Sequence, residues 1–148
     1  MSSGSTAVLY RVPARGIART ALREFARRLQ EEVAKGRPFV CLITGDAELR
    51  RLNKQFRKKD EATDVLSFPS SDPNHQLGEL AISWDRAKSQ AAEHGHTPGD
   101  ELRILMLHGV LHLTGMDHEK DNGNMARAEI RWRKRLNLPI SLIERAHK

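Results

Sequence analysis

The segment TPGDELRILMLHGVLHL, residues 97–113, carries the strongest structural signal in the chain. Thr97 is a good N-cap, Pro98 suits the first helical position, and two acidic residues follow in the first turn, as is common at helix N-termini. Most of the remaining residues are apolar, and they cover nearly every side of the helix. A helix that is apolar all round has to be buried. We therefore predict a central, buried helix here.

Three of the seven histidines lie at the end of this helix or just after it, in HGVLHLTGMDH at 108–118. His108 and His112 are one helical turn apart, so their imidazoles point the same way. Gly115 can adopt a positive φ and turn the chain back, which would bring His118 toward the same point. Three neutral imidazole nitrogens and an open fourth position are typical of a catalytic zinc site. We predict one zinc ion per chain, held by His108, His112 and His118.

The spacing HxxxHxxGxxH is also that of metzincin metalloproteases, in which a glutamate after the first histidine acts as the general base. This chain has Gly109 at that position. Without the glutamate, the metal alone would have to activate water, or another group would have to act as base. Asp117 and Glu119 adjoin His118, but an acidic neighbour more often orients a ligand. The pattern therefore argues against a protease.

The rest of the chain is predicted to alternate strands and helices. The predicted strands are AVLYRV (7–12), FVCLIT (39–44), DVLSFP (64–69) and LGELAIS (77–83), of which FVCLIT is apolar on both faces and therefore central. Predicted helices run from Pro13 to about Lys35, from a cap at Asp46, over residues 84–94, and near the C-terminus. His94 and His96 are predicted to face solvent. The chain has the length of one domain, so we predict a single domain, 1–148, of the α/β or α+β class.

Charge is a further indication of function. The chain has 25 Lys and Arg against 19 Asp and Glu, a net charge of +6. Basic residues are predicted to form two helical stripes, one of Arg15, Arg19, Arg23 and Arg27, the other of Arg127, Arg131, Lys134 and Arg135. Either stripe alone fits a solvated helix face, but two stripes in one basic domain make nucleic acid a candidate partner.

The cellular location is indicated by what the sequence lacks. The only cysteine, Cys41, lies within an apolar strand, so we predict a core residue and no disulfide. The N-terminal residues have no apolar leader, and no run of apolar residues is long enough for a membrane span. A reducing cytoplasm and no membrane partner are expected.

These motifs together resemble the YbeY family of bacterial metal-dependent endoribonucleases, which are maturation factors of ribosomal RNA. HGVLHLTGMDH is similar to the family signature HGxLHLxGxDH, LNKQFRKKDEATDVLSFP (52–69) is a second matching block, and LGELAIS lies between them. Glu79 stands where many members have aspartate. The resemblance, from about Leu52 to Glu119, implies an α+β fold with a small mixed four-stranded sheet against helices, and it carries the metal ligands onto His108, His112 and His118.

The second block also carries the functional arginine of the family onto Arg57. A guanidinium near zinc would neutralise charge on phosphoryl oxygens during cleavage. The resemblance implies a role in the processing and quality control of small-subunit ribosomal RNA and ribosomes. We expect the enzyme to cleave single-stranded RNA. Further partners implied by the resemblance are a small-subunit ribosomal protein and an assembly GTPase. Two alternatives stay open: an RNA-binding assembly factor with a mainly structural metal, and a zincin-like hydrolase of a non-nucleic substrate.

Overall fold

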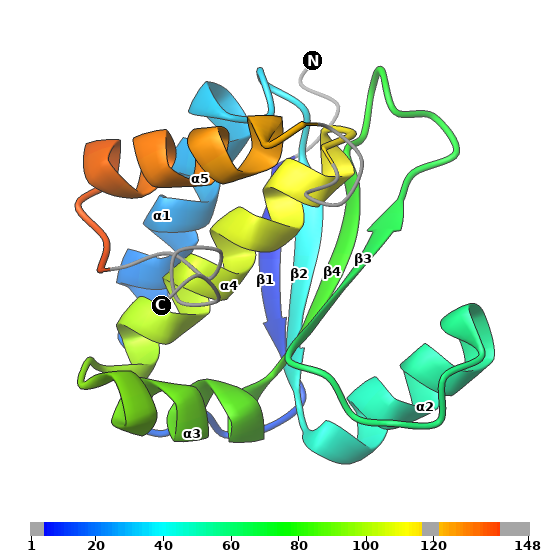
Figure 1. Cartoon of the computed structure of the whole chain (residues 1–148), viewed down its shortest axis with the longest axis vertical. Coiled ribbons are helices and arrows are strands. Elements are labelled where there is room, and N and C mark those ends of the chain that lie inside the picture. Colours follow the sequence, from blue (N-terminus) through cyan, green and yellow to red (C-terminus); the bar gives the residue numbers. More distant parts are fainter. Residues whose placement is uncertain (1–4, 117–121, 140–148) are drawn as a thin grey trace.

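The computed structural model describes residues 5–116 and 122–139 and contains a four-stranded sheet with five helices (Figure 1). The strands are β1 (Ala7–Tyr10), β2 (Phe39–Thr44), β3 (Val65–Pro69) and β4 (Gly78–Ser83). The helices are α1 (Arg19–Glu32), α2 (Asp46–Arg57), α3 (Trp84–His94), α4 (Pro98–Leu113) and α5 (Asn124–Arg135).

The sheet is mixed, with the strand order β1-β2-β4-β3. β1, β2 and β4 are parallel to one another, whereas β3 is antiparallel to β4. The predicted α+β class, the small mixed sheet and the central position of 39–44 are confirmed. Cys41 is fully buried in β2, and burial raises the pKa of its thiol to about 12, so it belongs to the core as predicted.

α4 is the centre of the larger core. Eleven of its 16 residues are buried, and its apolar side chains pack on the inner face of the sheet and on α1, α3 and α5. Thr97 accepts a hydrogen bond from the backbone N–H of Asp100 (3.1 Å), the predicted N-cap. The prediction of a central buried helix is thus confirmed, and Figure 1 shows α1, α4 and α5 on one side of the sheet.

α2 covers part of the opposite, outer face of the sheet. Leu49 of α2 joins Leu66 of β3 and Ala81 of β4 in a second, smaller core cluster. Because Ser67 points inward and Phe68 points outward, β3 lies between α4 and α2.

Two predicted helix starts are wrong. The first helix begins at Arg19 instead of Pro13, because Ala14 and Gly16 have positive φ values of 46° and 87° and turn the chain before the helix starts. The cap of α2 is Gly45, and the carboxylate of Asp46 accepts hydrogen bonds from Ser83 Oγ (2.6 Å) and Arg86 Nε (3.3 Å). Asp46 therefore links α2 to the start of α3 instead of capping its own helix.

The first helix also ends earlier than predicted. α1 ends at Glu32, before Lys35, which has a positive φ of 54° and cannot continue the helix. No helix within 5–116 and 122–139 is both long and apolar enough to span a membrane.

Candidate metal centre

His108 and His112 project from the last two turns of α4. Their ring centroids are 4.8 Å apart, and the rings are inclined at 73°. His108 is 8% exposed and His112 is half-buried, so the pair lies at the boundary of the core. The predicted convergence of these two imidazoles is therefore present in the structure.

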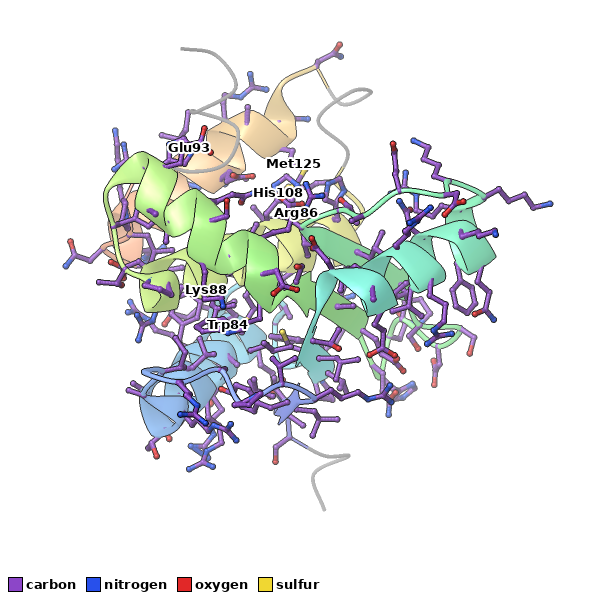
Figure 2. All side chains as sticks on the ribbon, turned by 90° about the horizontal axis from the view of Figure 1, so that it is seen from below. Trp84, Arg86, Lys88, Glu93, His108 and Met125 are labelled. Atoms are coloured by element: carbon purple, nitrogen blue, oxygen red, sulfur yellow. The ribbon has the colours of Figure 1, made fainter. Side chains whose placement is uncertain are left out.

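The ring of His108 is held in place by α5. Its Nδ1 lies 2.9 Å from Oε2 of Glu129, whose side chain is 1% exposed. A carboxylate accepts, so Nδ1–H of His108 donates, and Nε2 is the nitrogen suited to bind a metal. Figure 2 labels His108 of α4 and Met125 of α5, two helices that pack on each other. A buried carboxylate that orients a histidine is the usual support of a metal ligand.

The donor set of this centre fits zinc as far as the structure describes it. Two imidazoles one turn apart, one of them oriented through Nδ1, match the requirements of a tetrahedral site with nitrogen ligands. Within residues 5–116 and 122–139, no three His, Cys, Asp or Glu side chains form a metal-binding cluster. The third predicted ligand, His118, lies outside the described residues, as do Asp117 and Glu119.

Glu129 was not among the residues that the sequence singled out. A signal for it exists, because Glu129 falls between Met125 and Trp132 on the apolar side of the last predicted helix. A carboxylate on the inner face of an amphipathic helix needs a buried partner. That partner is His108.

Gly109 points from α4 toward the sheet. A Cβ atom at this position would lie 2.6 Å from Cδ2 of Leu80 and 3.3 Å from Oγ of Ser67. Ser67 Oγ also donates to the carbonyl oxygen of Gly109 (3.2 Å). The close packing of α4 on β3 and β4 therefore requires glycine here and leaves no space for the glutamate found in metzincins.

Arg57 is the last residue of α2 and is exposed. Its neighbour Phe56 packs edge-to-face on Phe68 of β3, with ring centroids 5.3 Å apart. α2 and α4 pack on opposite sides of β3, which is an edge strand of the sheet, and the described residues show no contact between Arg57 and the histidine pair. Arg57 forms no ion pair with any residue that the structure describes.

Of His94 and His96, which were both predicted to face solvent, only His94 does so. His94 is exposed, but the side chain of His96 is only 10% exposed, and its Nε2 lies 2.5 Å from Oε1 of the fully buried Glu101. The sequence shows Glu101 as an ordinary acidic residue in the first turn of a helix. Its burial follows from the packing around α4, which the sequence does not reveal.

The predicted stripe on the first helix is largely used in contacts within the chain. Arg15 lies before the helix, and the guanidinium of Arg19 lies 3.9 Å from the ring centroid of Tyr10 and donates to a backbone carbonyl. Arg27 forms an ion pair with Glu24 (3.2 Å). The solvated-face interpretation therefore fits most of this stripe.

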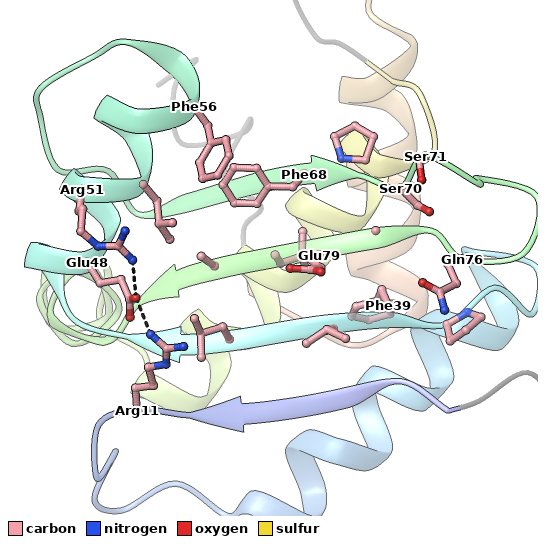
Figure 3. Close-up of a pocket in the computed structure, with 18 of the residues that line it drawn as sticks. Arg11, Phe39, Glu48, Arg51, Phe56, Phe68, Ser70, Ser71, Gln76 and Glu79 are labelled. Carbon is pink, nitrogen blue, oxygen red and sulfur yellow. Dashed lines mark hydrogen bonds and ion pairs between the residues drawn. The ribbon is translucent and has the colours of Figure 1, made fainter.

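A groove of about 670 Å³ lies on the outer face of the sheet beside α2 (Figure 3). Its apolar wall includes Phe56, which is 59% exposed, and Phe68. Arg11 and Arg51 both reach Glu48, at 2.6 and 3.0 Å, so that their charge is partly neutralised within the groove. Neither His108 nor His112 lines this groove, so it is separate from the metal centre.

Comparison with known proteins places these features in one family. The profile of the family described as "Endoribonuclease YbeY" matches residues 11–137. A protein named Endoribonuclease YbeY from Solibacter usitatus is 63% identical over 142 residues, covering 96% of this chain and 95% of the relative. Another of that name from Koribacter versatilis is 47% identical over 133 residues, covering 90% and 87%.

The fold has a counterpart among solved structures. The solution structure of TM1509 from Thermotoga maritima superposes with a TM-score of 0.59 at 27% sequence identity, covering 87% of this chain and 86% of that protein.

Proposed function

The chain belongs to the YbeY family of endoribonucleases, and from this premise we propose that it is a zinc-dependent endoribonuclease specific for single-stranded RNA. It acts in the maturation and quality control of small-subunit ribosomal RNA and ribosomes, in the cytoplasm. Its partners are ribosomal RNA and the small subunit, with a small-subunit ribosomal protein and an assembly GTPase as further candidates. The observation that carries the proposal is the buried bond between His108 and Glu129 next to His112.

Zinc would be held by His108 and His112 together with His118. When bound, it would supply a Lewis acid that activates water and neutralises phosphoryl charge. Glu129 fixes the ring of His108, and the packed core beneath α4 holds both imidazoles at a fixed spacing. Such support keeps a ligand set arranged before the metal or the substrate arrives.

Arg57 is proposed as the group that grips the phosphate. A guanidinium donates two parallel hydrogen bonds to two phosphoryl oxygens, which an ammonium cannot do in the same geometry. Its exposure and the absence of an ion pair with any described residue support this role. Lys58 and Lys59 follow directly and add to the positive potential at this end of α2.

Of the two alternatives, hydrolysis of a peptide is disfavoured by Gly109. The close approach of Leu80 and Ser67 excludes any carboxylate side chain at the position where a metzincin has its base. An assembly factor with a structural metal differs from our proposal only in the absence of cleavage.

Purified small-subunit ribosomal RNA incubated with the zinc-loaded protein tests the proposal. We expect cleavage that stops on chelation and returns with added zinc, at new ends that sequencing locates within single-stranded regions. Binding without cleavage favours the assembly factor, and cleavage that survives chelation contradicts zinc dependence. The termini distinguish two chemistries, because attack by the ribose 2′-hydroxyl leaves a cyclic phosphate and hydrolysis by water does not.

A further inference from the structure

α5 has two chemically opposite sides. Its inner side carries the buried Glu129, which holds His108 on α4. Its outer side carries four exposed basic residues, spaced so that they share one helical face: Arg127, Arg131, Lys134 and Arg135. Apart from Glu129, residues 122–139 contain no acidic residue. The exposed charged residues of α5 are therefore all basic.

Most of this charge has no acidic partner among the residues that the structure describes. Arg131, Lys134 and Arg135 form no ion pair with any residue in 5–116 or 122–139, although the guanidinium of Arg135 lies over the ring of Trp132 at 5.4 Å. Arg127 differs from the other three, because it donates to Asn124 and to the carbonyl of Asn122 at the start of its own helix. Three cations therefore stand at the surface without an acidic partner among the described residues.

The other predicted stripe provides a contrast within the same molecule. On α1, Arg27 pairs with Glu24 at 3.2 Å and Arg28 with Glu32 at 2.6 Å. These pairs neutralise two of the four arginines of α1. A helix whose arginines are already paired offers less to a polyanion than one whose arginines are not.

The cationic face lies on the side of α5 opposite to the metal centre. Glu129 and Arg131 are two residues apart, which is about 3 Å along the helix axis, so the charges lie about one helix diameter (about 10–12 Å) from the bond to His108. This separation is comparable with the Debye length of about 10 Å at 0.1 M salt. A strand that lies along the outer face of α5 is thus separated from the histidine pair by the width of this helix.

We infer that the outer face of α5, formed by Arg131, Lys134 and Arg135, binds the phosphate backbone of the single-stranded RNA substrate on the side of this helix that faces away from His108. The inference rests on the proposed function and adds to it the surface that holds the strand. Arginine and lysine side chains without acidic partners can bind the phosphates of RNA whatever its sequence. The planar guanidinium of Arg135 can in addition stack on an unpaired base. Affinity gained in this way depends on salt, because bound phosphates release counterions.

The test compares two triple variants of the full-length protein. Arg131→Gln, Lys134→Gln and Arg135→Gln remove the α5 charges together. Arg23→Gln, Arg27→Gln and Arg28→Gln remove the same number of charges from α1. For each protein, the Kd for a short fluorescein-labelled single-stranded RNA is measured between about 50 and 200 mM NaCl, the range over which phosphate contacts change affinity strongly. Gel electrophoresis checks that the RNA stays intact.

The slope of log Kd against log salt concentration is the readout. Each lost phosphate contact on a single strand changes this slope by about 0.7, so the α5 triple variant should flatten it by about 2, and the α1 variant should change it far less. Replacing Arg131 and Arg135 by lysine keeps their charge and should therefore leave the slope near that of the wild type. If the triple variant folds poorly, the single variants Arg131→Gln and Lys134→Gln, each expected to change the slope by about 0.7, provide the same measurement.

The outcomes separate the inference from the proposed function. If the wild-type protein cleaves RNA but the α5 variant keeps the wild-type salt slope, the inference about α5 is wrong and the proposed function stands. Equal flattening by the α1 variant also overturns it, since net charge would then account for the effect. Wild-type protein that neither binds nor cleaves RNA contradicts the proposed function as well.

Discussion

Replacing Glu129 by glutamine tests whether α5 supports the metal centre. The carboxylate is buried and lies 2.9 Å from Nδ1 of His108, so the substitution keeps the size of the side chain and removes the charge that polarises the ring. Loss of such a supporting group typically lowers metal affinity about 10–100-fold, which is about 1.4–2.7 kcal/mol. We expect a loss near the lower end, because the glutamine oxygen can still accept from Nδ1–H.

Glu101 provides a matched control on the same core helix. Its buried carboxylate lies 2.5 Å from Nε2 of His96, in a second pair of glutamate and histidine. Seven residues, about 10 Å along α4, separate Glu101 from His108. Glu101→Gln should destabilise the metal-free fold by about 1–3 kcal/mol, as Glu129→Gln should, but leave zinc affinity at the wild-type value.

Zinc affinity is measured by competition with a chromogenic chelator, and stability by urea denaturation of the metal-free protein. The two variants should be similar in stability and should differ by about tenfold in zinc affinity. Wild-type zinc affinity in Glu129→Gln would refute the assigned role. An equal loss of affinity in both variants would show that general destabilisation, and not orientation of His108, is responsible.

Three further substitutions address the remaining parts of the site. His112→Ala should lose most of the bound zinc on metal analysis, and full retention would contradict its assignment as a ligand. Arg57→Ala should keep the metal but slow RNA cleavage about 10²–10³-fold, which is the scale for the loss of one oxyanion contact. Arg57→Lys should restore the rate only in part. A wild-type rate in Arg57→Ala would exclude the phosphate role. Gly109→Ala should lower the free energy of unfolding by about 1–3 kcal/mol through overpacking against Leu80. Gly99→Ala, where the new Cβ has only ordinary contacts of 3.6 Å or more, should be neutral or stabilising in the same denaturation assay.

Helix ends and strands that depend only on side chains near in sequence could be predicted. The all-apolar helix, the Thr97 cap, the central strand at 39–44 and the helix end at Gly95 each follow from side chains within a few residues. The start of α1 does not, because the positive φ of Ala14 belongs to a turn that tertiary packing imposes on a residue with no preference for it. Asp46 likewise has the right chemistry for a cap, but its carboxylate is bound by α3.

The proximity of His108 and His112 could be predicted from the sequence, whereas the residue that orients His108 could not. Spacing along one helix is enough to bring His108 and His112 together. Glu129 reaches the site from a helix that begins 11 residues after the end of α4, so only tertiary structure shows which histidine it meets. His96 was misassigned for the same reason, since its partner Glu101 looked like a solvated first-turn acid.

The position of Gly109 explains why the supporting carboxylate comes from α5. The helix surface next to His108 on this side is in contact with the sheet, where Leu80 leaves no room even for a methyl group. No carboxylate can therefore approach from the side of Gly109, and among the described residues the carboxylate that reaches His108 comes from α5. Because α5 holds His108 with its inner side, its outer side is fixed at a constant distance from the centre. The triple glutamine variant of α5, which keeps Glu129, should therefore bind zinc with normal affinity and RNA more weakly. Glu129→Gln, which keeps the basic face, should bind zinc more weakly and RNA with normal affinity.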